Sequence, residues 1–468
     1  MHMIRYLAAL LCLIAFPAIA QPNVVLILVD DFSMNLMPDR AGQGQGYMPN
    51  LSAMQAEGMM LSNYIVADSL CCTSRASIFT GLLPHNTGVR SNVAPDGGLS
   101  AYVANGNDVR SLGVMLQGRG YKTAFMGKYL NGYDATTTPI PPGWNKWVAT
   151  DAGYAGFGYT LNNNGVLSTP PEHFTDTISN LGKPWINLNR QPFFLELAPF
   201  SPHSPFTPPA RHAAAFPGAV MPKTPAYDVL ADASAPAWLR AIPAMRAALK
   251  STIESNYRMR LQSSQGVDDM IGAVRAKLAT TGMAANTYVI FTSDNGFHMG
   301  EFSLRPGKQT PFDFDTNVPF VIVGPGIAPG STSAELVQNI DIWPTLAELA
   351  GAPPSSTVDG RSMVPLFTGG GNGRTMAVIE HRGSILDPSD PDYAEPKAGD
   401  PPTYTALRGA GWLYVEYATG EVGYYTDQHQ LRNVAAGLTP ERATALRAAV
   451  VANAGCSGAG CRAVQELP

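Results

Sequence analysis

The sequence has little charge, no basic excess and no internal repeat. Only 14% of its 468 residues are charged, and the formal net charge at pH 7 is −5. A chain without a basic excess lacks the electrostatic footprint of nucleic-acid binders, so we expect no nucleic-acid partner. Because 45% of the residues are hydrophobic, the composition also argues against disorder and indicates a globular protein with a large core.

Long hydrophobic runs are absent except near the N-terminus. Arg5 precedes an apolar run over residues 6–16, and the motif A-I-A follows at 18–20. This is the layout of a secretory signal peptide cleaved after Ala20. A membrane anchor is the alternative, but the run is well short of the ~20 apolar residues that a spanning helix needs. We therefore expect a periplasmic or secreted protein without a stable membrane anchor.

The chain has only five cysteines, of which Cys12 lies in the predicted signal peptide. Cys456 and Cys461 are spaced to close a small glycine-containing loop in an oxidising compartment. Cys71 and Cys72 are adjacent, and neighbouring cysteines rarely bridge each other. If the distal pair is bridged, they remain thiols, which exported proteins usually avoid. A reactive role and a core-filling role are both open for this pair.

Apolar, β-branched runs that end in acidic residues indicate a buried parallel sheet. Asn23–Val29 ends at Asp30 and Asp31, and residues 288–293 end at Asp294 and Asn295. Further strand-like runs lie at 123–126, 193–198 and 318–323, and helical patterns alternate with them at 52–57, 111–119 and 265–280. This alternation predicts an α/β fold with helices on both faces of a parallel sheet.

The sequence changes character after the glycines at 369–371. Short strand-like runs follow at 377–380, 404–407, 412–417 and 423–426, and residues 440–452 read as a helix with Thr439 as its N-cap. We therefore predict a catalytic domain over residues 21–370 after the signal peptide at 1–20. A C-terminal subdomain over 371–468 would contain a small antiparallel sheet and a packed helix.

Asp30, Asp31, Asp294 and Asn295 all follow the ends of predicted strands, where ligands bind in parallel sheets. Hard oxygen ligands of this kind suit calcium or magnesium. Simple capping of the strands in solvent is the alternative reading. Two such pairs favour a metal, which would relieve the repulsion between the carboxylates and supply a Lewis acid.

The segment S-L-C-C-T-S-R-A-S-I-F-T-G at 69–81 has the pattern of a helix start, with Gly81 as its stop. A thiol at a helix N-terminus lies among unpaired backbone N–H groups, which stabilise an anion. Arg75 is one helical turn from Cys71 and on the same face. These two residues are therefore candidates for one reactive site.

The stretch C-C-T-S-R-A-S-I-F-T-G-L-L-P-H-N-T-G-V resembles the signature of the type I sulfatases. The resemblance continues in order through M-P-N-L (48–51), G-Y-K-T-A-F-M-G-K-Y-L-N (120–131), P-P-G-W (141–144), S-P-H-S-P-F (201–206), T-S-D-N-G-F-H-M-G-E-F (292–302), G-K-Q-T-P-F-D-F-D (307–315), V-P-F-V-I-V-G-P-G-I (318–327) and D-I-W-P-T-L-A-E-L-A-G (341–351). Within that family it is most similar to N-acetylglucosamine-6-sulfatases and extracellular heparan endosulfatases. It implies an alkaline-phosphatase-like fold with a large mixed, mostly parallel sheet sandwiched by helices.

The resemblance also implies a cofactor and a maturation step. Cys71 would be oxidised to formylglycine by a formylglycine-generating maturation enzyme, and one hydroxyl of its hydrate would attack sulfur. A calcium ion, with magnesium as the alternative, would touch this residue and be held by Asp30, Asp31, Asp294 and Asn295.

The remaining site residues follow from the same resemblance. Arg75 would orient the hydrate, and Lys128, His203 and Lys308 would bind the sulfate oxygens and the bridging oxygen. Sulfate esters are anionic, so their cleavage needs such cations, and the leaving alkoxide needs a proton from His203 or a neighbour. His298 would either contact the substrate or pack beside the metal loop.

Two positions depart from the family pattern. Thr73 stands where many members have proline or alanine, which makes the maturation motif imperfect. Leu130 stands where many have a histidine that assists breakdown of the hydrate, and Asn131, placed beside the substrate, cannot act as a base near neutral pH. The N-acetylglucosamine-6-sulfatase-like members share the second departure.

The predicted function is an exported sulfatase that hydrolyses a sugar, aryl or alkyl sulfate, with a sulfated small molecule or saccharide as its partner. One alternative is a phosphodiesterase or phosphonate hydrolase of the same superfamily. Another is a catalytically silent protein that binds sulfated glycans and keeps Cys71 as a thiol. The negative net charge argues against broad electrostatic capture of a polyanionic glycan.

Overall fold

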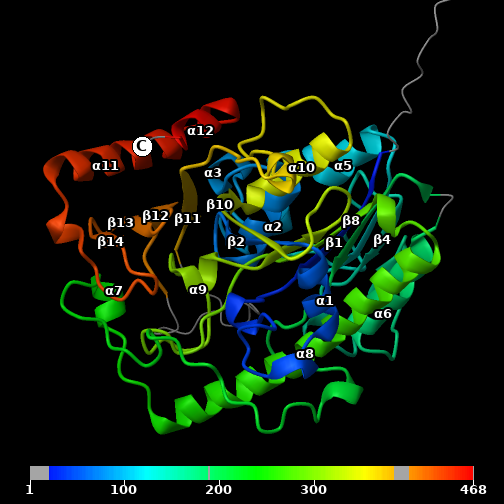
Figure 1. Cartoon of the computed structure of the whole chain (residues 1–468), viewed down its shortest axis with the longest axis horizontal. Coiled ribbons are helices and arrows are strands. Elements are labelled where there is room, and N and C mark those ends of the chain that lie inside the picture. Colours follow the sequence, from blue (N-terminus) through cyan, green and yellow to red (C-terminus); the bar gives the residue numbers. More distant parts are fainter. Residues whose placement is uncertain (1–20, 188–189, 384–399, 467–468) are drawn as a thin grey trace, which may run out of the picture.

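The computed structural model describes residues 21–187, 190–383 and 400–466, so the predicted signal peptide at 1–20 lies outside the described residues. A ten-stranded sheet with the order β10-β2-β9-β8-β1-β7-β3-β4-β5-β6 crosses the molecule (Figure 1). Its strands are β1 (Asn23–Val29), β2 (Met59–Ile65), β3 (Lys122–Gly127), β4 (Lys146–Ala149), β5 (Leu161–Asn163), β6 (Val166–Ser168), β7 (Phe193–Ala198), β8 (Thr287–Ser293), β9 (Phe320–Val323) and β10 (Ser331–Gln338).

The centre of this sheet is parallel. β8, β1, β7, β3 and β4 run in one direction, whereas β9, β5 and β6 pair antiparallel with their neighbours. All seven residues of β1 are buried, as expected for a strand covered on both faces. The prediction of a large mixed, mostly parallel sheet is therefore confirmed.

Helices cover both faces of the sheet (Figure 1). Val25 and Ile27 of β1 face a core that includes residues of α1 (Pro49–Glu57), α6 (Phe174–Gly182) and α8 (Ala247–Thr280). Val24 and Leu26 face the opposite core, which includes residues of α2 (Cys71–Thr80), α5 (Leu112–Gly118) and α10 (Ile342–Leu349). Because successive side chains of a strand point to opposite faces of the sheet, β1 packs against both helical layers.

Two predicted boundaries were wrong. The helix predicted at 265–280 begins at Ala247, because polar residues in its first half obscure an apolar stripe that still contains the buried Ile253, Tyr257 and Leu261. The strand predicted at 318–323 begins at Phe320, because Pro319 has no N–H group for the ladder.

A second, four-stranded antiparallel sheet lies to the left of the large sheet in Figure 1. Its strands and helices are β11 (Met376–His381), β12 (Tyr404–Gly409), β13 (Trp412–Tyr417), β14 (Val422–Tyr425), α11 (Pro440–Ala454) and α12 (Ala459–Val464). The Thr439 side chain accepts a hydrogen bond from the Arg442 backbone N–H, which confirms the predicted N-cap. Cys456 and Cys461 form the expected disulfide. The domain boundary near residue 370 stays a prediction.

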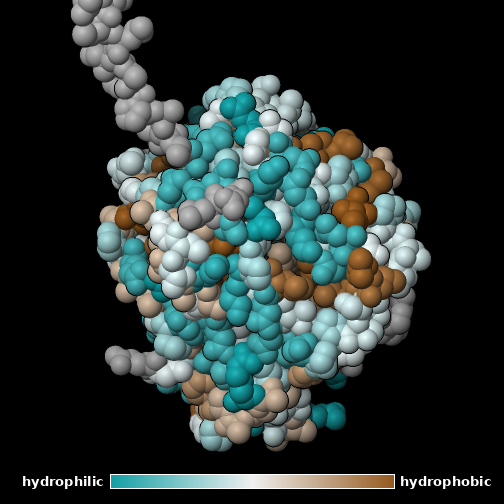
Figure 2. Space-filling model, turned by 90° about the vertical axis from the view of Figure 1, so that its right-hand side faces the viewer, coloured by the Kyte–Doolittle hydropathy of each residue, from teal (hydrophilic) through white to brown (hydrophobic). Residues whose placement is uncertain are grey.

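The surface of the molecule is predominantly polar on the face shown in Figure 2, where hydrophobic residues gather toward the right-hand side. Large hydrophobic side chains are also exposed at Val166 and Leu167 of the edge strand β6. A few exposed apolar residues of this kind are normal on a protein surface. Among the described residues, no helix combines the length and apolar character needed to cross a membrane.

Candidate active site

Four neighbouring parallel strands deliver polar residues to one edge of the large sheet. β1 ends before Asp30 and Asp31, and β8 ends before Asp294. β3 is followed by Lys128, and the loop after β7 contains His203. Because β8, β1, β7 and β3 are adjacent in this order, residues far apart in the sequence meet at their carboxyl ends, as parallel sheets require.

The backbone at the end of β3 allows no side chain. Gly127 has φ +148°, and a Cβ atom there would lie 2.0 Å from the Ala198 carbonyl oxygen of β7. The next residue, Lys128, donates its backbone N–H to that same oxygen at 2.8 Å. Glycine at this point is therefore needed to bring the two strand ends together, and this contact fixes where the Lys128 side chain starts.

Cys71 is the first residue of α2, and every residue of this helix is buried. Its Sγ atom lies 2.7 Å from Lys308 Nζ and 3.5 Å from Asp30 Oδ1. Lys308 Nζ also donates to Asp31 Oδ1 at 2.9 Å. The thiol therefore faces both a fixed cation and the acidic strand ends.

Cys72 has a different environment. Its backbone N–H donates to Asn92 Oδ1 at 3.0 Å, and its side chain belongs to the apolar core on the α2 face of the sheet. Burial raises the pKa of the Cys72 thiol to about 12, so this thiol stays protonated at neutral pH. Neither Cys71 nor Cys72 forms a disulfide.

Arg75 connects the strand ends. Its Nε donates to Asp294 Oδ2 at 2.8 Å and its Nη1 donates to the Lys128 carbonyl at 2.9 Å, while Nη2 lies 4.0 Å from Asp30 Oδ1. Burial would lower the pKa of the Arg75 guanidinium, but Asp294 and Asp30 raise it, so it stays charged. Burial and repulsion by Asp30 raise the pKa of Asp294 to about 6 against the attraction of Arg75.

Lys128 is 3% exposed, and its Nζ donates to Asp30 Oδ2 at 2.7 Å. Burial would raise the pKa of the Asp30 carboxyl, but Lys128 and the other cations around it outweigh burial and hold that pKa well below its usual range. The ammonium also lies over the Tyr154 ring, 4.9 Å from its centroid, and 5.8 Å from the centroid of Phe200. Aromatic faces add to the stabilisation of this buried cation.

His203 has a defined tautomer. Its Nδ1 lies 2.8 Å from the Ser204 carbonyl, which can only accept a hydrogen bond, so Nδ1 carries a proton. Nε2 faces Asp31 Oδ2 at 3.6 Å, and it carries a proton only when the ring is cationic. The ring also contacts Tyr154, with 4.8 Å between centroids. His203 is thus oriented to give or take a proton at Nε2.

The carboxylate and amide oxygens at the strand ends suit a hard cation, whereas the Cys71 thiol and the His203 imidazole beside them are softer ligands. Ligand atoms of Asp30, Asp31, Cys71 and His203 all lie within 4.8 Å of one another. Asp31 Oδ2 and Asn295 Oδ1 are buried oxygens without a hydrogen-bond partner, which is the condition a metal ion would relieve.

Asp294, like Asp30, has protein partners for both of its carboxylate oxygens, whereas Asp31 and Asn295 each keep one oxygen without a hydrogen-bond partner. In Asp294, Oδ1 accepts from the backbone N–H groups of Asp31 and Asn295 at 3.2 and 2.8 Å, and Oδ2 accepts from Arg75 at 2.8 Å. Asn295 Nδ2 donates to Asp31 Oδ1 at 2.6 Å. The structure thus places Asp294 beside the cluster as its organiser, and its predicted role as a metal ligand remains a prediction.

His298 and Asn131 occupy opposite surroundings. His298 is fully buried, with Nδ1 2.9 Å from Asp315 Oδ2, and it forms a backbone bridge to Gly307, next to Lys308. This bridge joins the His298 backbone to the segment that carries Lys308, and both predicted roles of His298 stay predictions. Asn131 is partly exposed and lines a cavity next to Lys128.

Three residues that contact the candidate site residues were not identified from the sequence. Tyr154 contacts both Lys128 and His203, and Asp315 holds His298. Arg260 of α8 donates Nη2 to the Asp31 carbonyl at 2.5 Å. None of these lies at a predicted strand end, and Arg260 lies in the half of α8 that was not predicted.

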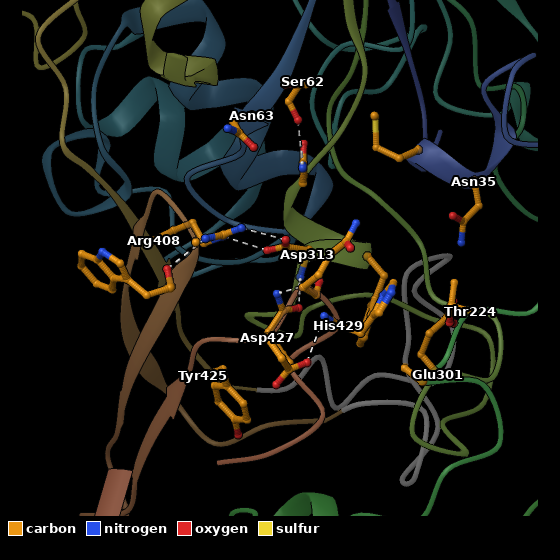
Figure 3. Close-up of a pocket in the computed structure, with 18 of the residues that line it drawn as sticks. Asn35, Ser62, Asn63, Thr224, Glu301, Asp313, Arg408, Tyr425, Asp427 and His429 are labelled. Carbon is orange, nitrogen blue, oxygen red and sulfur yellow. Dashed lines mark hydrogen bonds and ion pairs between the residues drawn. The ribbon is translucent and has the colours of Figure 1, made fainter. Parts of the chain in front are cut away.

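A second cavity, of about 530 Å³, lies between the two sheets and is larger than the cavity beside Lys128 (Figure 3). Asn63 of β2 and Tyr425 of β14 line it, and Arg408 of β12 donates to both oxygens of Asp313 at 2.9 Å within it. None of the predicted catalytic or metal-binding residues is among its described lining residues. Its size therefore does not mark it as the reaction site.

Comparisons with known proteins agree with this geometry. The sulfatase family model matches residues 22–352. N-acetylglucosamine-6-sulfatase of Capra hircus is 31% identical over 94% of this chain and 85% of its own length. A solved structure described as a complex with its substrate D-glucosamine-2-N,6-O-disulfate has a TM-score of 0.77 at 18% identity, covering 92% of this chain and 97% of that one.

A phosphonate monoester hydrolase from Silicibacter pomeroyi also shares the fold, with a TM-score of 0.67 at 21% identity over 92% of this chain and 93% of that one. Likeness at this level shows the fold and not the reaction. The family match and the 31% identity go further: the chain belongs to the sulfatase family. It is a sulfuric ester hydrolase.

Proposed function

We propose that this chain is an exported sulfatase that cleaves the sulfate ester of a small saccharide, with Cys71 oxidised to formylglycine and one calcium ion. The observation that carries the proposal is the setting of Cys71 Sγ. It lies at the start of a buried helix, 2.7 Å from Lys308 Nζ and 3.5 Å from Asp30 Oδ1. A nucleophile at this point meets cations for the substrate on one side and oxygen ligands on the other.

The cationic residues would have different roles in cleavage of the anionic ester. Lys128 and Lys308 would neutralise the sulfate oxygens as charge develops on them. His203, with Nδ1–H fixed on the Ser204 carbonyl, would present Nε2–H to the leaving oxygen when the ring is cationic. Formylglycine at position 71 would supply the attacking hydroxyl of its hydrate, and Arg75 would hold that hydrate in place.

Asp30, Asp31 and Asn295 would hold the calcium ion, with Asp294 as a further ligand and the residue at 71 beside it. Two buried oxygens without a hydrogen-bond partner, Asp31 Oδ2 and Asn295 Oδ1, support this assignment. When bound, calcium would supply Lewis-acid stabilisation to oxygens at the reacting centre. The same oxygen-rich set would accept magnesium less well, because magnesium demands a tighter octahedral arrangement.

The names of similar proteins support a saccharide substrate. The goat relative is named for a sulfated N-acetylglucosamine, and the solved neighbour holds a glucosamine disulfate. The predicted signal peptide and the Cys456–Cys461 disulfide support export to an oxidising compartment. We further propose residues 21–370 as the catalytic domain and 371–468 as the C-terminal subdomain.

The deciding experiment is mass analysis of the peptide that contains residues 71 and 72, from protein made together with a formylglycine-generating enzyme. Conversion of Cys71 with Cys72 unchanged is expected. Cys71→Ala should abolish sulfate release, whereas Cys72→Ala should retain much of it. An unmodified peptide from a protein that hydrolyses phosphonates in preference to sulfates would overturn the proposal.

A further inference from the structure

A cavity of about 360 Å³ opens directly beside the predicted sulfate-binding residues. Lys128, Tyr154 and Phe200 form the wall that it shares with the site. This volume is near the lower end of the ~300–1,000 Å³ typical of small-molecule pockets. It suits one sugar residue better than a segment of polymer.

The cavity is lined by four segments of the chain. Three of them are the loops that follow β3, β4 and β7, and the fourth leads into the first turn of α4 (Gly98–Ala104). Together they contribute side-chain amides and hydroxyls. The polar lining residues other than the two charged ones are Asn92, Ser100, Asn131, Thr150 and the tyrosines Tyr129, Tyr133 and Tyr154. Amides and hydroxyls beside aromatic rings are suitable partners for the hydroxyl groups and apolar faces of a pyranose.

Only two of the described lining residues are charged, Lys128 and Asp151. Lys128 is bonded to Asp30 at 2.7 Å and is assigned to the scissile sulfate. Asp151 is an exposed lining residue, and its Oδ1 accepts a long hydrogen bond of 3.4 Å from the Ala135 backbone N–H. A second anionic group on the sugar would therefore meet a carboxylate and no further lining cation.

We propose that this cavity receives the sugar that carries the scissile sulfate, and that Asp151 makes it select sugars whose other substituents are uncharged or cationic. The inference rests on the proposed function and names its substrate class. Glucosamine 6-sulfate and N-acetylglucosamine 6-sulfate fit this class. Glucosamine 2-N,6-O-disulfate does not, because its N-sulfate adds a second negative charge.

The size of the effect follows from Coulomb's law. At a separation of roughly 6–8 Å in a medium between protein surface and water, one unit charge changes an affinity roughly three- to tenfold. Wild-type protein should therefore show a kcat/KM for N-acetylglucosamine 6-sulfate several-fold above that for the disulfate. Because Asp151 is exposed, raising the ionic strength should shrink this ratio.

The test compares Asp151→Asn and Asp151→Lys with wild type on the three sugars. The ratio of kcat/KM for the N-acetyl substrate to that for the disulfate should fall roughly three- to tenfold in Asp151→Asn and further in Asp151→Lys. Asp134→Asn is the matched control, because Asp134 belongs to the loop after β3 but not to the cavity lining. It should keep the wild-type ratio.

The outcomes separate this inference from the proposed function. Sulfate release with a ratio that neither Asp151 variant nor salt changes would overturn the role of Asp151 and leave the sulfatase assignment intact. Release from 4-nitrophenyl sulfate but from none of the sugars would overturn the sugar cavity alone. Release from no sulfate ester, with Cys71 unmodified, would overturn both. The salt series uses wild-type protein, so a ratio that salt does not change would overturn the electrostatic selection even if a variant fails to fold.

Discussion

Replacing Lys128 by alanine tests whether this buried lysine stabilises the reacting sulfate or only pairs with a carboxylate. Lys128 is 3% exposed, donates to Asp30 Oδ2 at 2.7 Å and lies 4.9 Å from the Tyr154 ring centroid. Lys128→Ala removes one fixed donor from the position where negative charge grows during cleavage. Loss of one such donor costs about 3 kcal/mol of transition-state stabilisation, or roughly a hundredfold in kcat/KM at about 1.4 kcal/mol per tenfold.

The same change affects the fold less than a broken buried pair usually does. Removing one partner of an isolated buried ion pair costs about 3–5 kcal/mol. Around Asp30, however, His203, Arg75 and Lys308 also lower the carboxyl pKa, so the remaining charge is not left uncompensated. We expect a lower melting temperature with a native circular dichroism spectrum.

Sulfate release from 4-nitrophenyl sulfate, measured beside thermal unfolding, separates these two effects. Lys122→Ala is the matched control, because Lys122 lies at the exposed start of the same strand and the substitution removes the same charge. The control should retain wild-type kcat/KM. If Lys128→Ala keeps more than about a tenth of kcat/KM, Lys128 is a structural partner of Asp30 and does not stabilise the reacting sulfate.

Three further predictions address the proton donor, the metal and the C-terminal contact. His203→Ala should reduce kcat/KM on sugar sulfates more than on 4-nitrophenyl sulfate, since only an alkoxide needs a proton to leave; equal losses would contradict the proton-donor role. Elemental analysis should find about one calcium per chain, and Asp31→Asn should lower the calcium content, whereas an active form with only zinc would contradict the assignment. Burial lowers the pKa of His85, but Glu380 at 2.8 Å outweighs burial and raises it. This stabilisation is complete below the unfolded pKa of about 6.5 and disappears as pH rises through the higher folded pKa, so the melting temperature should fall over that range in wild type and less in His85→Gln.

Some site residues could be predicted from the pattern of the sequence without any family resemblance, and these residues follow a strand or lie in a helix. Asp30 and Asp294 follow apolar strands, so strand ends place them together without knowledge of the fold. Cys71 and Arg75 are one helical turn apart, so the helix period is enough. In each case a local rule, strand direction or helix spacing, determines the side chain's neighbourhood.

The remaining residues depend on contacts between loops, for which no local pattern exists. Lys128 and His203 were assigned by resemblance to a family, because without it a single lysine is more readily interpreted as a surface charge and a single histidine as a hydrogen-bonded loop residue. Tyr154 gave no signal in the sequence, since its importance comes from the contacts of its ring with those two side chains. Arg260 reaches the Asp31 carbonyl from α8, which packs on one face of the sheet, and only the packing of that helix defines this contact.

The charges at the strand ends explain why the binding of calcium and the binding of a sulfate ester should be linked. Three permanent cations contact the carboxylates of Asp30, Asp31 and Asp294: Lys128, Lys308 and Arg75. These charges balance before any substrate is present, so an arriving sulfate ester adds a negative charge that the carboxylates repel. A divalent ion on the carboxylate oxygens offsets that charge and lets the two lysines share their donors with sulfate. The affinity for a sulfate ester should therefore rise with bound calcium, while the lysine variants lose affinity whether or not calcium is bound.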